Sequence, residues 1–406
     1  MEEKQGSFIK FSQQGQLMPL EEKLATASKK KSLKIGIPKE LSPNENRVPL
    51  VPESVNLLVE NGHEVIIERG AGQQAHFSDS QYAEAGAVLT DSIEEVYKSE
   101  IIIKISPPDY NEIEMMEKGK TIFSSVFLAN RSSKYFEKIV NKKAKAIGYE
   151  YIKDKSGSFP VIKSMSEIVG NTAIIIAAEH LSNLTYGKGK MLGGFPGLNP
   201  SEVVIIGAGT VAEYAARTAI GLGASVKIFD DTIYKLRDIQ KSLGSRVFTS
   251  VLQPKVLQKA IKSADVVIAA KHTHDETSPY MVSEEMLKQM NEGSVIVDVS
   301  IDQGGCFETS RLTTHEHPVY QEHGITHYCV PNIASRVPHT ASYSLSNYLT
   351  PVLLRISDFG GVENMLKQDH AFCKGIYVYN GILTNKSIGK KYNLPYQDLE
   401  LLLSAF

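Results

Sequence analysis

Residues 202–231 read EVVIIGAGTVAEYAARTAIGLGASVKIFDD, and this stretch decides the fold of the chain. An apolar run, Val203 to Ile206, leads into the turn Gly207-Ala208-Gly209, which is followed by an alanine-rich stretch from Ala212 to Leu222 and a second apolar run that ends at Asp230. This order and length predict a strand, a helix and a second strand, which together form one βαβ unit of a parallel sheet.

The glycine turn has the spacing of a dinucleotide-binding fingerprint. Gly207 allows a tight turn, Gly209 lets the backbone approach a pyrophosphate, and the small Ala212 lets the helix pack closely on the sheet. The helix would then point its free N–H groups and the positive end of its dipole at the phosphates. Asp230, 23 residues after Gly207, is placed to bind a ribose diol and to repel a 2′-phosphate. We therefore predict a site for NAD rather than NADP; the alternative is a purely structural turn.

The composition indicates a soluble enzyme-sized chain with a small-molecule partner. At 406 residues we expect two domains, and 44 basic against 46 acidic residues give no broad basic patch for nucleic acid. The three cysteines, Cys306, Cys329 and Cys373, form no disulfide or zinc pattern and are typical of a reducing compartment. No apolar run approaches the roughly 18 to 20 residues that span a bilayer, and the first residues do not have the order of a signal peptide. We expect a cytoplasmic protein without a metal or a membrane segment.

The rest of the chain alternates strand and helix patterns on both sides of the fingerprint. Residues 1–33 form a polar extension, and structure is expected from the strand at Leu33 to Ile37 onward. A capping-box pattern, Ser164-Met165-Ser166-Glu167, predicts a long helix from Met165 to Leu184 between two α/β units. A second long helix, Ala341 to Asp358, is expected to cross back. The predicted fold is α/β, with two Rossmann-like doubly wound domains. Their expected limits are residues 34–160 plus 339–406 for a discontinuous substrate domain completed by the C-terminal segment, and 161–338 for the NAD-binding domain.

Three charged residues follow predicted strands at the edge where α/β sheets bind ligands. Asp302 lies just after the strand Ser294 to Val299, where a carboxylate could orient a substrate or transfer a proton; it could equally cap a turn. Arg47, in the loop after the first strand, suits a bidentate clamp on a carboxylate, with a surface ion pair as the alternative. Lys104 ends an apolar strand and is either a carboxylate or carbonyl ligand or a solvated strand end.

Histidines give weaker signals. His272 and His274 follow the strand Asp265 to Ala270, and their H-x-H spacing alone is weak evidence for a metal site. His339 precedes the returning helix, where it either faces the cleft or only begins the helix. The sequence therefore predicts no metal.

Several segments together resemble the alanine dehydrogenase family, whose fold is shared by the nicotinamide-binding subunit of proton-translocating transhydrogenase. The resemblance covers the chain from about Leu33 to the C-terminus. Its segments are IGIPKELSPNENR (35–47), Met165-Ser166-Glu167, MLGGFPG (191–197), the fingerprint, and DVSIDQGGCFE (298–308). The resemblance implies two Rossmann-like domains with a cleft between them and a homo-oligomer, commonly a hexamer. It also implies NAD-dependent, reversible oxidative deamination of L-alanine to pyruvate and ammonia.

The resemblance also implies roles for single residues. Arg47 matches the arginine that holds the substrate carboxylate, and Asp302 matches the aspartate near the nicotinamide. On the cofactor side, Asp230 matches the ligand of the adenosine ribose, and Ser166 and Lys235 match further cofactor contacts.

At two positions the sequence departs from the family pattern. The family's K-V-K-E-P reads KISPP at residues 104–108, so that Ser106 replaces the lysine that contacts the substrate, and Lys104 alone remains. The family's F-L-H-L-A reads SVFLA at residues 125–129, which puts Phe127 at the position of the catalytic histidine. Phenylalanine cannot transfer a proton, so either Lys104 polarises the keto group while Asp302 or a histidine from elsewhere transfers protons, or the protein carries out other chemistry.

A third departure lies in the cofactor loop, and the alternatives for function follow from all three. Residues 271–276 read KHTHDE where the family usually has an apolar V-P-G-A segment. Besides an amino acid dehydrogenase, the sequence is compatible with a transhydrogenase-like NAD(H)-binding subunit, and with an oligomeric NAD-binding protein without turnover.

Overall fold

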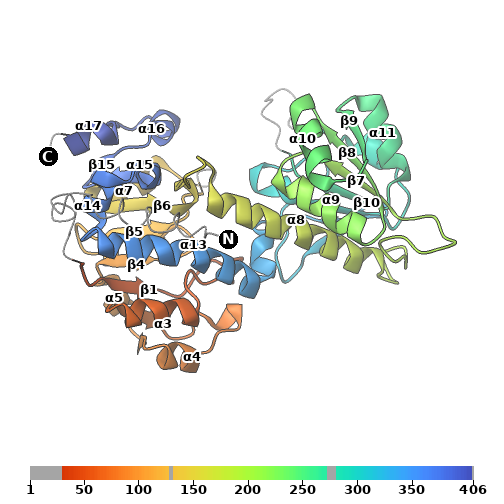
Figure 1. The fold of residues 1–406 in the computed structure, drawn as a ribbon. Coiled ribbons are helices and arrows are strands. Elements are labelled where there is room, and N and C mark those ends of the chain that lie inside the picture. Colours follow the sequence, from red (N-terminus) through yellow and green to blue (C-terminus); the bar gives the residue numbers. More distant parts are fainter. Residues whose placement is uncertain (1–29, 128–130, 272–279, 405–406) are drawn as a thin grey trace, which may run out of the picture.

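The structure is a computed structural model that describes residues 30–127, 131–271 and 280–404, and two α/β sheets dominate it (Figure 1). Each sheet has its own set of helices, and two long helices connect the two parts. Residues 1–29 of the expected N-terminal extension lie outside the described residues, and so do His272 and His274.

The first sheet has eight strands in the order β15-β14-β6-β5-β4-β1-β2-β3. All neighbouring pairs are parallel except β14 with β6 and β14 with β15, which are antiparallel. The N-terminal domain is therefore completed by the C-terminal segment, which confirms its predicted discontinuity. The strands are β1 (Lys34–Ile37), β2 (Glu64–Glu68), β3 (Val88–Thr90), β4 (Ile101–Ile103), β5 (Thr121–Ser124), β6 (Lys145–Gly148), β14 (Ile376–Tyr379) and β15 (Ile382–Leu383).

The second sheet has seven strands in the order β12-β13-β11-β10-β7-β8-β9, and only β12 is antiparallel to its neighbour. The fingerprint supplies the neighbouring parallel strands β7 and β8, as predicted. The strands are β7 (Glu202–Ile206), β8 (Ser225–Asp230), β9 (Phe248–Val251), β10 (Val266–Ala269), β11 (Val295–Asp298), β12 (Val319–Glu322) and β13 (Ile325–Tyr328).

Helices cover both faces of each sheet, so the central strands are apolar on both sides. On the first sheet, the core on one face includes side chains of α3, α4, α13 and α14, and the core on the other includes those of α5, α6 and α7. On the second sheet, α8, α9 and α10 cover one face, and α11 and α12 cover the other. The α-helices are α3 (Pro52–Glu60), α4 (Asp79–Glu84), α5 (Ile93–Tyr97), α6 (Tyr110–Met115), α7 (Ser133–Asn141), α8 (Pro160–Leu181), α9 (Thr210–Gly221), α10 (Ile233–Leu243), α11 (Pro254–Ser263), α12 (Glu284–Leu287), α13 (Pro338–Asp358), α14 (Val362–Gln368), α15 (His370–Cys373), α16 (Lys386–Tyr392) and α17 (Leu399–Ser404).

The connecting helix α8 begins earlier than the capping-box pattern predicts. It starts at Pro160, and Ser164 lies inside it, where its hydroxyl donates a hydrogen bond to the Val161 carbonyl (3.1 Å). Proline fits the first helical position because an N–H there would have no acceptor within the helix, so nothing is lost without it. The φ of proline is also already helical. The predicted cap at Ser164 is therefore wrong by one helical turn.

By length and composition alone α8 could cross a membrane, with an 18-residue window of mean hydropathy 1.4, contrary to the sequence-based expectation. Its apolar side chains Ala173, Ile174, Ile176 and Ala177 are nevertheless fully buried in the core of the second sheet. The helix packs against both α9 and α13. It is the core helix of a folded domain.

Close packing of α8 on α9 depends on Gly170. A methyl group at Gly170 would overlap the carbonyl oxygen of Val211 and lie 2.8 Å from the Cβ of Tyr214. We therefore expect Gly170→Ala to lower the free energy of unfolding by about 1–3 kcal/mol, the usual cost of overpacking. Urea denaturation followed by circular dichroism measures this change.

The matched control is Gly221→Ala, at the last residue of α9. No atom lies within 4 Å of a methyl group added there, so stability should stay the same or rise by up to about 1 kcal/mol. Equal effects of the two substitutions would contradict the close approach of α8 and α9.

Candidate active site

The glycine turn of the second sheet is shaped to hold a dinucleotide. Gly207 has φ of +116°, and a Cβ there would lie 2.6 Å from the Ala270 carbonyl oxygen, so only glycine fits. At Gly209, by contrast, an added Cβ meets nothing within 4 Å, which leaves open space above the turn. Gly209 is also the N-cap of α9 and supplies no side-chain acceptor for the first N–H groups. These groups and the open space fit a pyrophosphate, while Ala212 is fully buried against the sheet, as predicted.

Asp230 holds this turn from the neighbouring strand β8. Its Oδ2 accepts a hydrogen bond from the Ala208 N–H (2.9 Å), and its Oδ1 accepts one from the Thr232 N–H (2.9 Å). The carboxylate is 2% exposed. Because each carboxylate oxygen can accept two hydrogen bonds, the predicted contact with a ribose diol is compatible with these two bonds.

The two other predicted cofactor contacts lie on helices beside the turn. Ser166 is half-buried on α8, one turn before Gly170, which touches the first turn of α9. Lys235 is half-buried near the start of α10, which follows Asp230. Both roles remain predictions.

The segment after β11 is folded tightly around a buried carboxylate, Asp298. Its Oδ1 accepts a hydrogen bond from the Ser300 N–H (3.0 Å), and its Oδ2 accepts bonds from the Cys306 N–H (2.8 Å) and the Ser310 hydroxyl (2.6 Å). Gly304 and Gly305 take φ of +109° and +86°, which reverses the chain between these bonds. The DVSIDQGGCFE segment is therefore a closed loop that fixes the 3₁₀ helix η4 (Val299–Gln303), on which Asp302 lies.

Asp302 is presented at the surface of this loop. It is exposed to solvent, yet enough protein surrounds its carboxyl group that desolvation raises its pKa. The backbone of Asn332 and the positive charge of Arg47 act on this carboxylate electrostatically and oppose that shift. Arg47, which follows the first strand of the first sheet, is therefore near enough to Asp302 of the second sheet for their charges to interact.

Arg47 is buried and bound by Glu45. Its Nε donates to Glu45 Oε1 (2.7 Å) and its Nη2 donates to Glu45 Oε2 (2.6 Å), while Nη1 contacts Met165 Sδ of α8 (3.5 Å). Glu45 occupies one edge of the guanidinium, and the N–H groups of the other edge that do not contact Met165 are available to a ligand. The ion pair that the alternative interpretation placed at the surface is therefore buried. It fixes the orientation of the Arg47 side chain.

Asn332 connects these groups and was not found by sequence reasoning. Its side-chain amide donates to Glu45 Oε2 (2.9 Å) and to the Asn44 carbonyl (3.1 Å), and its backbone acts electrostatically on Asp302. Its backbone is left-handed, with φ of +58°, a conformation that asparagine tolerates better than most residues. One residue between β13 and the 3₁₀ helix η5 (Ile333–Arg336) thus links the two predicted site residues.

The ammonium group of Lys104 is not free to bind a substrate. It is 1% exposed, and its Nζ lies 2.6 and 2.7 Å from the two carboxylate oxygens of Glu112 on α6. A second carboxylate, Glu40, lies 3.9 Å away. The predicted solvated strand end is therefore wrong, because α6 covers the strand and supplies the counter-ion.

Glu40 is a second residue that sequence reasoning missed. It follows β1, and its carboxylate accepts hydrogen bonds from the Ile105 and Ser106 N–H groups at the end of β4. Burial raises the pKa of Glu40 to about 7, although Lys104 opposes the shift. A carboxyl group that titrates near neutral pH at the edge between β1 and β4 is suited to proton transfer.

The two positions that depart from the family pattern lie on neighbouring strand ends. Ser106 follows β4, and Phe127 follows β5, where Ser125 bonds to the Ile105 carbonyl through its N–H (2.9 Å). Phe127 is 46% exposed and takes φ of +44°, which is rare for an aromatic residue. Both side chains therefore lie at the carboxyl edge of the first sheet.

Two further histidines differ in their surroundings. His315 interacts electrostatically with Glu45 and with the Asn332 backbone, and its Nε2 is buried without a hydrogen-bond partner among the described residues. Burial lowers the pKa of His315. His339 is exposed at the start of α13 and stacks on Phe77 (ring centroids 4.8 Å apart), so it begins the helix, as the alternative interpretation held.

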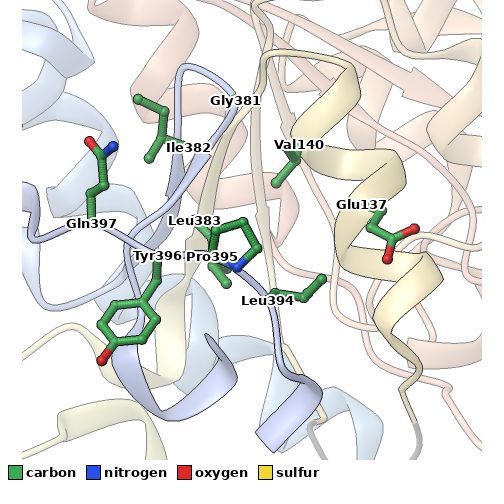
Figure 2. A pocket seen from close by; sticks show the side chains of 9 residues that line it. All are labelled: Glu137, Val140, Gly381, Ile382, Leu383, Leu394, Pro395, Tyr396 and Gln397. Carbon is green, nitrogen blue, oxygen red and sulfur yellow. The ribbon is translucent and has the colours of Figure 1, made fainter. Parts of the chain in front are cut away.

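A cavity of about 330 Å³ lies elsewhere, at the outer edge of the first sheet (Figure 2). Figure 2 shows that its lining comes from α7, from β15 and from the segment around Pro395. No predicted site residue lines it, so we do not assign it to the chemistry. In residues 30–127, 131–271 and 280–404, no group of three or more His, Cys, Asp or Glu side chains could hold a metal ion.

Two family models match the chain and together cover most of it. One is described as "Alanine dehydrogenase/PNT, N-terminal domain" and matches residues 36–169; the other is the C-terminal domain of the same family and matches residues 173–386. The chain belongs to the alanine dehydrogenase/PNT family. This confirms the resemblance inferred from the sequence, and members of this family bind NAD(H).

Relatives within the family are similar over nearly their whole length. The alanine dehydrogenases of Staphylococcus saprophyticus and Methanococcus maripaludis are each 38% identical to this chain, over 91% of this chain and 99% of their own. A solved L-alanine dehydrogenase structure has a TM-score of 0.81 at 36% identity and covers 88% of this chain. A transhydrogenase from Sinorhizobium meliloti has a TM-score of 0.71 at 23% identity over 87% of this chain, which shows a shared fold. The protein is thus an alanine dehydrogenase-like oxidoreductase.

Proposed function

We propose that this protein catalyses the NAD-dependent, reversible oxidative deamination of L-alanine, or of a similar small amino acid, to pyruvate and ammonia. The observation that carries this proposal is the link from Arg47 through Glu45 and Asn332 to Asp302. It joins a carboxylate-binding group on the first sheet to a proton-accepting group on the second. The names of the most similar relatives support the same substrate class.

In this proposal the chain's own residues orient the substrate and move its protons. The free edge of Arg47 binds the substrate carboxylate, because a guanidinium pairs with a carboxylate through two parallel hydrogen bonds. Asp302 accepts a proton from the substrate ammonium group or from the attacking water, and its raised pKa suits that exchange. Gly207, Gly209 and Asp230 would hold NAD at the glycine turn, and the cofactor would supply the acceptor for the hydride of the substrate Cα.

Lys104 has an indirect part in this scheme. Its charge is already shared between Glu112 and Glu40, so it does not polarise the keto group itself. We assign it the positioning of Glu40, whose carboxylate lies at the end of β4 beside Ser106. In this scheme neither Ser106 nor Phe127 transfers a proton.

The remaining expectations concern the assembled protein. We propose a homo-oligomer, hexameric by resemblance, in the cytoplasm, with residues 34–160 plus 339–406 as the substrate domain and 161–338 as the NAD-binding domain. The three cysteines are free and buried, in keeping with a reducing compartment. Analytical ultracentrifugation measures the oligomeric state directly.

The test is an assay in two stages on the full-length protein. Titration with NADH, followed by its fluorescence, measures cofactor binding, and NADH oxidation with pyruvate and ammonium then measures turnover. A panel of other small 2-oxo acids defines the substrate. NADH binding without oxidation by any member of the panel would overturn the enzymatic proposal while keeping the cofactor site.

Arg47→Lys tests the carboxylate clamp. Lysine keeps the positive charge beside Glu45 but loses the planar fork, so we expect KM for pyruvate to rise by about tenfold or more, the equivalent of one charge-assisted hydrogen bond. The dissociation constant for NADH should not change. The matched control is Arg69→Lys, since Arg69 pairs with Asp91 at an exposed site; a rise in KM for both variants would contradict the role of Arg47.

A further inference from the structure

Lys271 forms an ion pair at the place where the sequence predicts the adenosine ribose. Its Nζ lies 2.8 Å from Asp231 Oδ1 and 3.5 Å from Asp230 Oδ1. The lysine side chain is 14% exposed, whereas that of Asp231 is 62% exposed. The pair is therefore partly shielded from water, and its lysine is the better buried member.

The sheet topology explains how Lys271 reaches these carboxylates. Asp230 ends β8, and Lys271 follows β10; these two strands are the neighbours of β7, which leads into the glycine turn. The Cβ of Lys271 would lie 3.3 Å from a Cβ built at Gly207, so the lysine passes beside the turn. Although the backbone of Lys271 follows β10, its ammonium group therefore lies beside the carboxylates at the end of β8.

This ion pair changes the electrostatic argument on which the NAD prediction depends. A free carboxylate at Asp230 would repel a 2′-phosphate. Here both oxygens of Asp230 already accept backbone N–H bonds, and a positive charge lies 3.5 Å from one of them. Hydrogen bonds from Lys271 and Thr232 also lower the pKa of Asp231, so this carboxylate stays charged and keeps the lysine in place.

A lysine in this position can also bind a phosphate directly. An ammonium group is a compact charge with three donors, and lysine is a common phosphate ligand in proteins. Asp231 is largely exposed, so it can give up Lys271 to water and counter-ions at little cost. Lys271 would then exchange one anionic partner for another.

We propose that Lys271 sets the cofactor preference of this protein by screening Asp230 and by pairing with a 2′-phosphate, so that the adenosine subsite accepts NADP(H) as well as NAD(H). The proposal extends the NAD site of the proposed function and does not depend on which amino acid is oxidised. It concerns only the two carboxylates and the lysine that face the ribose from β8 and β10.

The experiment compares the binding of NADH and NADPH to the full-length protein by fluorescence titration. We expect the wild-type protein to bind NADPH within about tenfold of NADH. Lys271→Met, which keeps the apolar stem and removes the charge, should weaken NADPH binding by about tenfold or more, the loss of one charge-assisted hydrogen bond. NADH binding should change by less than threefold. The matched control is Lys188→Met, because Lys188 pairs with a largely buried aspartate, Asp265, at the opposite edge of the same sheet.

A second variant acts in the opposite direction. Asp231→Asn removes the exposed partner of Lys271 and should tighten NADPH binding while Asp230 still holds the glycine turn. Failure of the wild-type protein to bind NADPH, or an equal loss of NADH and NADPH binding in Lys271→Met, would overturn the proposal. Because titration requires no turnover, a protein that binds both cofactors but does not oxidise them with any 2-oxo acid would overturn the proposed function and leave this inference standing.

Discussion

Asp302→Asn is expected to lower kcat with pyruvate and ammonium by about 10²- to 10⁴-fold, the usual contribution of a general acid or base. Asparagine keeps the size of the side chain and a polar oxygen, but it cannot carry a proton. The dissociation constant for NADH should stay within about threefold of the wild-type value, because the substitution leaves the contacts that bind NADH in place. Steady-state kinetics and NADH titration on the same preparation measure both.

The control for this variant is Asp91→Asn. The side chain of Asp91 is 85% exposed and pairs only weakly with Arg69 (3.3 Å). Its kcat should match that of the wild type. If Asp302→Asn retained more than a tenth of the wild-type kcat, proton transfer would have to be assigned elsewhere, and Glu40 and His315 would be the residues to replace next.

Lys104→Met is expected to lower the free energy of unfolding by about 3–5 kcal/mol, because it leaves Glu112 as a buried charge without a partner. Both side chains are about 1% exposed, so water cannot replace the lost ammonium group. Urea denaturation monitored by circular dichroism gives the change in stability.

A double variant separates a structural role of Lys104 from a catalytic one. Glutamine at position 112 can still accept the Asp109 N–H that Glu112 binds at the start of α6 (2.7 Å), so Lys104→Met combined with Glu112→Gln removes both charges and keeps the cap. We expect this pair to recover most of the lost stability. If the single variant were as stable as the wild type but inactive, Lys104 would be a catalytic residue, as the sequence first suggested.

The sequence predicted those parts of the fold whose signals are local. Helices such as α10 and α11 are of this kind, because apolar periodicity runs unbroken between clear stops such as Gly244 after α10 and Pro254 at the start of α11. The hairpin of β14 and β15 was missed, although Asn380-Gly381 between two apolar runs is typical of a tight turn. Its pairing with β6 is a contact between distant segments, which no local pattern specifies.

The candidate site divides in the same way. Gly207, Asp230 and Asp302 follow from strand ends and turn chemistry, which the sequence displays directly. Asn332 does not, because its importance comes from a left-handed backbone and from interactions with residues of both sheets. The burial of Lys104 was also hidden, since its partner Glu112 lies on a helix that the sequence pattern did not predict.

The late position of β14 in the chain has a consequence for synthesis on the ribosome. β6 ends at Gly148, but the strand that covers its outer edge begins only at Ile376, after the whole second sheet has been made. Until then β6 presents unpaired N–H and C=O groups, which other chains can use for pairing. The nucleotide-binding half can fold first, since domains usually fold as units during translation. Nascent chains that stop before Ile376 should therefore aggregate or recruit chaperones, and release of the last strands should end that exposure.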